Sequence, residues 1–222
     1  MFALAVSLAI FHLLAVISPG PDFALVIRNA SVSSRKLSLF TVIGITLGNM
    51  VHISYCFAFF LYITNKESIL YLLLMIFGAI YLMYFGVSCL KSFFSFSKLT
   101  TSQITQTTTD TKFEKRKKRQ FFANGFFTNL LNGKAALYFI SIFSKYMSPQ
   151  YQLSWKIFFI TEIVLITFTW FTFVSFVMTS SVVQRKFLSK RKYIDLVFGI
   201  VIILFSITMF VDVFISCFNK LV

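Results

Sequence analysis

The sequence is poor in charged residues and poorer still in acids. Of its 222 residues, 13% are Asp, Glu, Lys or Arg, which is about half the share in soluble domains, and only seven are acidic. Hydrophobic residues make up 58% of the chain, phenylalanine occurs 31 times, and the mean hydropathy is +0.83. This composition excludes a soluble globular enzyme, a disordered protein and a nucleic-acid-binding domain.

Cysteine and proline are also scarce, with three of each. Cys56, Cys89 and Cys217 fall within apolar segments and have neither metal-ligand spacing nor a paired motif, so packing is their expected role. The apolar segments also lack clustered carboxylates, thiolates or histidines, and we predict no metal site and no cofactor. Two of the three prolines lie two residues apart, at positions 19 and 21.

Long apolar segments dominate what is present. A helix that spans a bilayer needs about 20 mostly apolar residues, whereas a membrane β-barrel needs short alternating segments. The first segment is not expected to be a signal peptide, because no Lys or Arg precedes Arg28. The sequence predicts an all-α membrane protein with six transmembrane helices, within residues 2–18 (resuming at 23–27), 37–63, 69–90, 120–144, 157–183 and 193–218.

Basic residues indicate the orientation of these helices. Most of the 21 Lys and Arg residues fall in the first, third and fifth connections, within residues 28–36, 91–119 and 185–192. Because Lys and Arg accumulate in cytoplasmic loops, we expect these connections inside and both termini outside. The basic segment 115–119 abuts a span, so it is interpreted as a topology determinant with some attraction to anionic lipid, and no nucleic-acid partner is expected.

A Ser/Thr-rich and then basic segment, 92–119, is predicted to be a mobile cytoplasmic linker between two halves, 1–91 and 120–222. Each half holds three predicted spans. Since three is odd, the second half enters the membrane from the opposite side. The sequence therefore predicts two inverted three-helix repeats, a plan common among secondary transporters.

The first predicted span is interrupted by Pro19, Gly20, Pro21 and Asp22. Proline removes a helical N–H and clashes with the carbonyl four residues before it, so carbonyls at Ala15 and Ile17 should be freed. Broken backbone persists in a membrane only where it is buried or lines a cavity. We expect Asp22 to cap the helix that resumes, and a simple proline kink is the alternative.

The fourth span is interrupted at a matching position, by Asn129, Asn132, Gly133 and Lys134. A lysine inside a span is costly, and Lys134 lies about fourteen residues from either end of its apolar run, which makes snorkelling difficult. Asn129 and Asn132 are three residues apart and share a helix face. Interrupted segments at corresponding positions of two halves indicate a transport site.

The second span carries a small-residue pair, Gly44 and Gly48, which allows close helix approach. Asn49 and His52 follow on one face and are candidates for a transport pathway. His12 stands alone on an apolar helix, and a structural role is expected for it.

Two further acids lie in predicted spans. Glu162 and Asp212 could each be a proton site or a partner of Lys134, or could lie near the outer interface, which we favour for Glu162. Asp195 follows Arg191 and Lys192 and is expected at the inner surface.

Four segments of the chain carry recognisable motifs: Pro19–Asn29, Gly44–His52, Gly78–Gly86 and Phe122–Ala135. Together they resemble the LysE/RhtB family of bacterial amino-acid exporters. In family terms, Asn49 stands where an acid is usual and Gly133 where a proline is usual, so one candidate proton carrier is absent.

The resemblance implies a multi-pass protein of the bacterial inner membrane that exports amino acids or close derivatives, driven by protons, and that is not an enzyme. A zwitterion needs two opposite charges: Lys134 and N–H groups of a resuming helix could take its carboxylate, and Asp22 and freed carbonyls its ammonium. The alternatives are an exporter of another small solute or metal ion, or a non-transporting assembly protein. A homo-oligomer is possible on this sequence.

Overall fold

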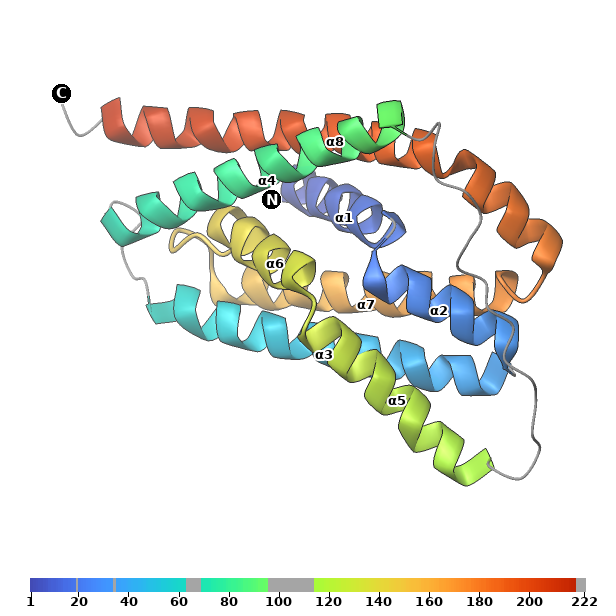
Figure 1. The fold of residues 1–222 in the computed structure, drawn as a ribbon. Coiled ribbons are helices and arrows are strands. Elements are labelled where there is room, and N and C mark those ends of the chain that lie inside the picture. Colours follow the sequence, from blue (N-terminus) through green and yellow to red (C-terminus); the bar gives the residue numbers. More distant parts are fainter. Residues whose placement is uncertain (19, 34, 63–68, 96–113, 219–222) are drawn as a thin grey trace.

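The computed structural model describes residues 1–18, 20–33, 35–62, 69–95 and 114–218 and contains only helices in those ranges (Figure 1). The expectation of an all-helical protein is confirmed. The eight helices are α1 Phe2–Ile17, α2 Pro21–Val32, α3 Arg35–Tyr62, α4 Ile69–Ser95, α5 Glu114–Leu130, α6 Gly133–Tyr146, α7 Leu153–Val177 and α8 Ser181–Phe218.

Four of these helices, α3, α4, α7 and α8, are long and apolar enough to cross a membrane, and the bent pair α1 and α2 gives a fifth candidate span. The two members of that pair meet at an angle of 59°. Segment 120–144, expected to be one span, is divided between α5 and α6. On the described residues, length and apolarity therefore support four to five spans rather than the six expected.

Both expected interruptions are present. α1 ends at Ile17, and α2 begins at Pro21 with Gly20 as its N-cap residue. Proline suits this first helical position, where its missing N–H is not needed. α5 ends at Leu130, and α6 begins at Gly133, with the Asn132 side chain accepting a hydrogen bond from the backbone N–H of Lys134. That bond satisfies one of the first N–H groups of α6.

Two expected connections are partly helical instead. α7 ends at Val177 and α8 begins at Ser181, so the basic segment 185–192 forms the first turns of a 38-residue helix. Residues 91–95 end α4, and residues 114–119 begin α5. Residues 96–113, the rest of the expected mobile linker, lie outside the described part of the chain.

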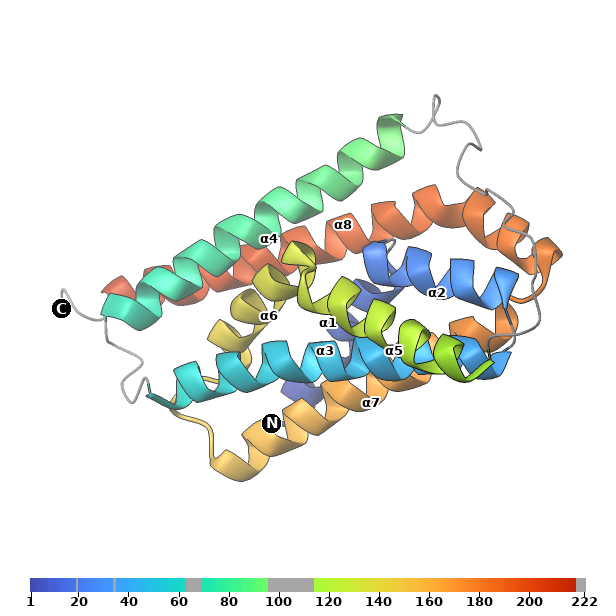
Figure 2. The same cartoon turned by 60° about the horizontal axis from the view of Figure 1, so that its bottom comes forward.

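The helices form two closely packed pairs, α3 with α5 and α4 with α8, and the second pair runs side by side in both views (Figures 1 and 2). Backbone meets backbone in the first pair: a Cβ on Gly44 would overlap the Phe122 carbonyl, and one on Gly125 would overlap the Thr41 carbonyl. Gly86 and Gly199 approach each other in the second pair, where a Cβ on either would lie about 3 Å from the other's carbonyl oxygen. The small residues thus set the helix spacing, as membrane interfaces require.

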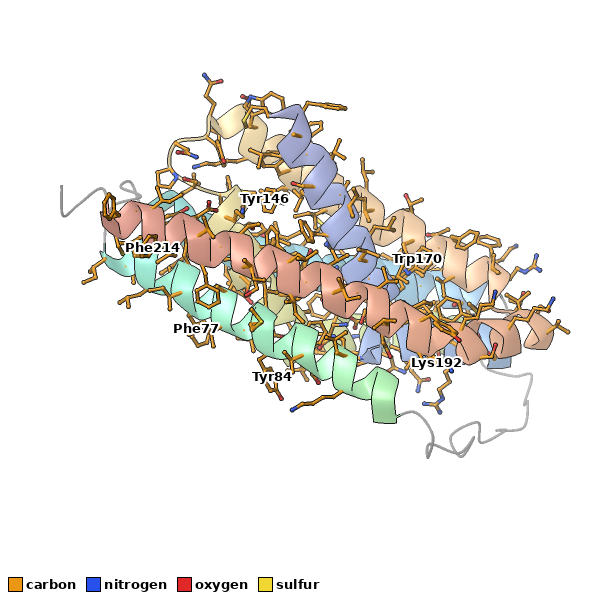
Figure 3. The ribbon with its side chains drawn as sticks, turned by 90° about the horizontal axis from the view of Figure 1, so that it is seen from above. Phe77, Tyr84, Tyr146, Trp170, Lys192 and Phe214 are labelled. Carbon is orange, nitrogen blue, oxygen red and sulfur yellow. The ribbon has the colours of Figure 1, made fainter. Side chains whose placement is uncertain are left out.

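Two hydrophobic clusters fill the bundle. The larger joins α1, α3, α4, α6, α7 and α8 around side chains such as Leu8, Phe143 and Phe159, and the smaller joins α2, α3 and α7 around Val26 and Ile45. Large apolar side chains also cover the outside; Phe77 and Tyr84 of α4 are 53% and 70% exposed and point away from the bundle (Figure 3). An apolar exterior of this kind matches a lipid environment.

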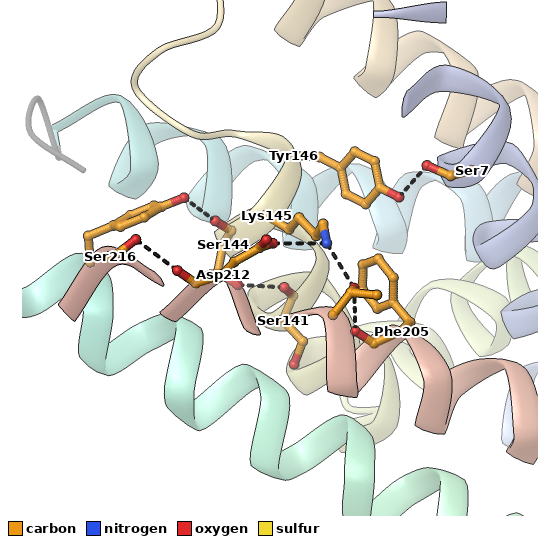
Figure 4. A network of polar contacts seen from close by, with 10 residues as sticks. Ser7, Ser141, Ser144, Lys145, Tyr146, Phe205, Asp212 and Ser216 are labelled. Atoms are coloured by element: carbon orange, nitrogen blue, oxygen red, sulfur yellow. Dashed lines mark hydrogen bonds and ion pairs between the residues drawn. The ribbon is translucent and has the colours of Figure 1, made fainter. Parts of the chain in front are cut away.

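A polar network ties the end of α6 to α8 (Figure 4). Lys145 forms an ion pair with Asp212 at 3.0 Å and donates a hydrogen bond to the Thr208 hydroxyl. Asp212 therefore pairs with Lys145, and the alternative that it is the partner of Lys134 is wrong.

Candidate functional site

A cavity lies where the two helix breaks meet. The space between its lining residues amounts to about 470 Å³, including the part open to the outside. Five of the ten residues expected at a transport site line it: Gly20, Asp22, Asn49, Asn132 and Lys134. The other lining residues are His12, Ala15, Val16, Ser18, Phe23, Ala135, Tyr138, Phe139 and Phe171.

The other five expected site residues lie elsewhere or outside the description. Pro21 and Gly133 begin α2 and α6 and are exposed, whereas His52 and Asn129 are buried behind the lining residues. Pro19 falls outside the described residues. The backbone at Gly20 is extended, with φ of −156°, a conformation open to any residue.

Asp22 faces the cavity from the first turn of α2. The N-cap residue of α2 is Gly20, and Asp22 lies within the first turn, so the expectation that Asp22 caps this helix is wrong. Its Oδ2 instead accepts hydrogen bonds from the Nδ2 atoms of Asn129 at 2.9 Å and Asn132 at 3.0 Å. Its Oδ1 is buried, and the structure shows no hydrogen-bond partner for it among the described residues. One carboxylate oxygen is thus held in place while the other can receive a donor.

Lys134 lines the same cavity as Asp22 and lies in the first turn of α6. Its Nζ lies 3.3 Å from Ser18 Oγ and 3.5 Å from the Ser18 carbonyl oxygen, so it contacts the broken end of α1. Its Nζ also lies 4.9 Å from the ring centre of Phe85 and 5.7 Å from that of Phe198, within the range of cation–π attraction. Lys134 therefore points into the bundle and does not snorkel toward an interface.

Asn129 holds this arrangement together. Its Nδ2 donates to Asp22 and also to Asn49 Oδ1 at 2.8 Å. Its backbone carbonyl accepts from His52 Nε2 at 3.0 Å. Its amide group packs on Gly48, where an added Cβ would lie 2.7 Å from Asn129 Oδ1. The missing side chain at Gly48 thus leaves room for the Asn129 amide, in addition to allowing close helix approach.

A chain of hydrogen bonds continues from Asn49 across the bundle. Asn49 Nδ2 donates to Thr167 Oγ1 at 3.2 Å. Thr167 Oγ1 lies 2.8 Å from His12 Nε2, and His12 Nδ1 lies 3.0 Å from the Tyr138 hydroxyl. Asn49 both donates and accepts here, which an ionised aspartate could not do.

His12 was expected to be purely structural, yet it lines the cavity and is 1% exposed. Ser18, Thr167 and Tyr138 were not expected at the site at all. Sequence spacing does not show which helix faces meet, so it could not indicate these three residues.

Two further acids, Glu162 and Asp195, do not line the cavity. Glu162 on α7 is half-buried, and its Oε2 has no hydrogen-bond partner among the described residues. Asp195 is 5% exposed and lies one turn before Phe198, whose ring contacts Lys134. Its expected place at the inner membrane surface stays a prediction.

The site therefore offers a fixed ammonium and a carboxylate with one open oxygen, in an enclosure otherwise lined largely by apolar and uncharged polar side chains. A small ligand that carries both charges would match it. A charged group inside a membrane protein is expected to have a function, because burying it is costly.

Known proteins are similar to this chain over most of its length. The model of the LysE type translocator family matches residues 13–212. The threonine efflux protein of Escherichia coli (strain K12) is 32% identical over 197 residues, covering 88% of this chain and 91% of that protein. That of Salmonella typhimurium is 31% identical with the same coverage, and an uncharacterized membrane protein of Haemophilus influenzae is 28% identical over 90% of this chain and 92% of its own. No solved structure matches significantly.

Proposed function

The chain belongs to the LysE type translocator family, and we propose that it exports amino acids from the cytoplasm, with protons as the driving ion. Threonine is the first substrate to test, because two relatives at 31–32% identity are named threonine efflux proteins. The cavity between the two helix breaks is the observation that carries this proposal.

In the proposed complex the substrate ammonium binds Asp22 Oδ1, the oxygen without a partner among the described residues. The substrate carboxylate binds Lys134 Nζ, which lies at the long distances of 3.3 Å from Ser18 Oγ and 3.5 Å from the Ser18 carbonyl oxygen. A charge-assisted bond to a carboxylate is shorter and stronger than such contacts. The N–H of Lys134 is taken by Asn132, so the side chain rather than this N–H is the proposed anchor.

Proton coupling is proposed at Asp22. Among the residues that line the cavity, Asp22 is the one carboxylic acid, and Asn49 occupies the position at which the family usually has another. A proton and a substrate ammonium would both bind the same oxygen of Asp22, and each would exclude the other. Such competition at one group couples two fluxes in opposite directions when the protein changes sides only with a proton or a substrate bound.

We further propose six spans, formed by α1 with α2, α3, α4, α5 with α6, α7 and α8, in two inverted halves within 1–91 and 120–222. Both broken spans supply cavity residues, which supports this plan. The end of α2 and the starts of α3, α5 and α8 gather at one end of the bundle (Figure 1). These segments hold the basic residues, so that end is proposed to face the cytoplasm of the bacterial inner membrane, with both termini outside.

The test is efflux from cells preloaded with dipeptides, which raise internal amino acids. Cells that make this protein should release threonine, or another amino acid, faster than cells that lack it, and a protonophore should abolish the difference. Lys134→Met should abolish it as well, whereas Lys145→Met, on the same helix but outside the cavity, should not.

Absence of extra efflux for every amino acid, with the protein verified in the membrane, would overturn the proposal. Efflux that persists in Lys134→Met would overturn the binding site but not the export function. Efflux that is insensitive to a protonophore would remove the proton coupling alone.

A further inference from the structure

We propose that the Tyr138 hydroxyl, positioned by His12, binds the side chain of the substrate and selects short side chains that carry a hydrogen-bonding group. This inference rests on the proposed function, because it assigns the third subsite of the same cavity. The two charges of an amino acid are common to all substrates, so selection among them needs a separate contact.

Tyr138 is placed for such a contact. It lies four residues after Lys134 on α6, on the same face and about 6 Å along the helix. Both residues line the cavity, and so does His12 of α1, whose Nδ1 lies 3.0 Å from the Tyr138 hydroxyl. A substrate whose carboxylate binds Lys134 therefore directs its side chain toward the pair formed by His12 and Tyr138.

The hydrogen bonds around His12 leave the Tyr138 hydroxyl with one unused bonding capacity. If Thr167 donates to His12 Nε2, then Nδ1 carries the proton and donates to the Tyr138 oxygen, whose own O–H is left to point into the cavity. If His12 Nε2 donates to Thr167 instead, Tyr138 donates to Nδ1 and presents its lone pairs to the cavity. In both tautomers the described residues supply no second partner to Tyr138 beyond His12.

A substrate hydroxyl can donate or accept, so it satisfies Tyr138 in either tautomer, whereas a methyl group satisfies it in neither. A site built to bond a polar substituent discriminates against the analogue that lacks it, since its own buried polar group is then left unpaired. Ala15, Val16 and Ala135 line the same cavity and suit a short apolar remainder.

His12 acts as a positioning residue in this scheme. It is 1% exposed and is held on its other nitrogen by Thr167, which in turn accepts from Asn49. The Tyr138 hydroxyl is therefore oriented through three side chains on α1, α7 and α3, and its direction depends on His12 keeping both of its bonds.

The test compares threonine with valine, which has nearly the same shape but a methyl in place of the hydroxyl. Cells that make the full-length protein are preloaded with dipeptides of either amino acid, and initial efflux above that of cells without the protein is measured. The ratio of threonine to valine efflux is the readout, because it does not depend on how much of a variant reaches the membrane.

Tyr138→Phe should lower this ratio about three- to tenfold, the effect expected of one hydrogen bond. His12→Phe should lower it to a similar extent. The double variant should show no further loss, since both changes remove the same hydrogen bond, the one between Tyr138 and the substrate. Tyr84→Phe is the matched control: it makes the same chemical change on an exposed residue of α4 and should leave the ratio unchanged.

A wild-type protein that exports both amino acids equally, or a Tyr138→Phe variant with the wild-type ratio, would overturn this inference while the proposed function stands. Independent, additive effects of the two single variants would overturn the positioning role of His12. Release of no amino acid by the wild-type protein would overturn the proposed function and this inference together.

Discussion

Three glycines in α3 and α6 should respond differently to alanine, because the structure places different atoms next to each. A Cβ on Gly48 would lie 2.7 Å from Asn129 Oδ1 and 3.1 Å from its Cγ, so the Asn129 side chain must move. That side chain donates to Asp22 and to Asn49 at 2.9 and 2.8 Å. Gly48→Ala should therefore disturb the site before it disturbs the fold.

The size of the effect follows from the two hydrogen bonds at risk. Each contributes about 0.5–1.5 kcal/mol net, so losing both costs about 1–3 kcal/mol. If this free energy is lost from the binding of the transported substrate, the transport rate falls by roughly 5- to 150-fold. Gly44→Ala differs, because the added Cβ would overlap the backbone of Phe122 and would lie 2.7 Å from the backbone nitrogen of Phe126, neither of which can rotate away.

The assay is threonine efflux together with the thermal stability of the detergent-purified variants. Gly48→Ala should fold and transport poorly, and Gly44→Ala should fail to accumulate as folded protein. Gly133→Ala should fold normally, since nothing lies within 4 Å of its added Cβ. Wild-type transport by Gly48→Ala, or a stable Gly44→Ala protein, would refute the packing of α3 on α5 described above.

Two further pairs of variants test separate contacts. Lys145→Met and Asp212→Asn should each lower the free energy of unfolding by less than about 1 kcal/mol, as measured by thermal unfolding. The reason is that the ion pair is partly exposed, at 19% for the Lys145 side chain and 47% for that of Asp212. A larger loss would show that this pair makes a major contribution to the packing of α6 on α8. Asn132→Ala should lower stability by about 0.5–2 kcal/mol through loss of a helix cap and should also slow efflux, because Asn132 donates to Asp22. Asn132→Ser should restore stability but not efflux, and recovery of both would argue that capping is the whole role of this residue.

The helix breaks could be predicted because their causes are local. Proline lacks an N–H, so residues 19–21 had to interrupt a helix, and an Asn-Gly-Lys sequence in an apolar segment needed polar partners. Asn129 and Asn132 were expected to share one helix face, which is wrong because α5 ends at Leu130 between them and Asn132 is the N-cap residue of α6. Both side chains nevertheless reach Asp22.

Helix boundaries in the second half were not predictable from charge alone. The basic segment 185–192 was expected to be a loop because Lys and Arg avoid the membrane core. However, Lys and Arg have good helix propensity. The helix α8 therefore already includes this basic segment and runs on from it into the apolar residues. Charge indicates which residues are outside lipid and does not indicate where a helix ends.

Partners across the bundle were the part that sequence could not supply. Asp22 was expected to bond its own helix but bonds two asparagines more than 100 residues away. His12 was expected to be structural, because nothing near it in sequence shows that Thr167 and Tyr138 meet it. These contacts depend on which helix faces meet, and that is decided by the packing of α1, α6 and α7 together.

Exchange across a defined membrane tests the central claim most directly. The purified protein is placed in liposomes loaded with unlabelled threonine, and uptake of labelled threonine against it is followed for the wild type, Asp22→Asn, Lys134→Met and Lys145→Met. The account predicts rapid exchange by the wild type and Lys145→Met, and none by Lys134→Met or Asp22→Asn. Exchange by Lys134→Met and Asp22→Asn at the wild-type rate would contradict the assignment of the cavity between the helix breaks as the substrate site.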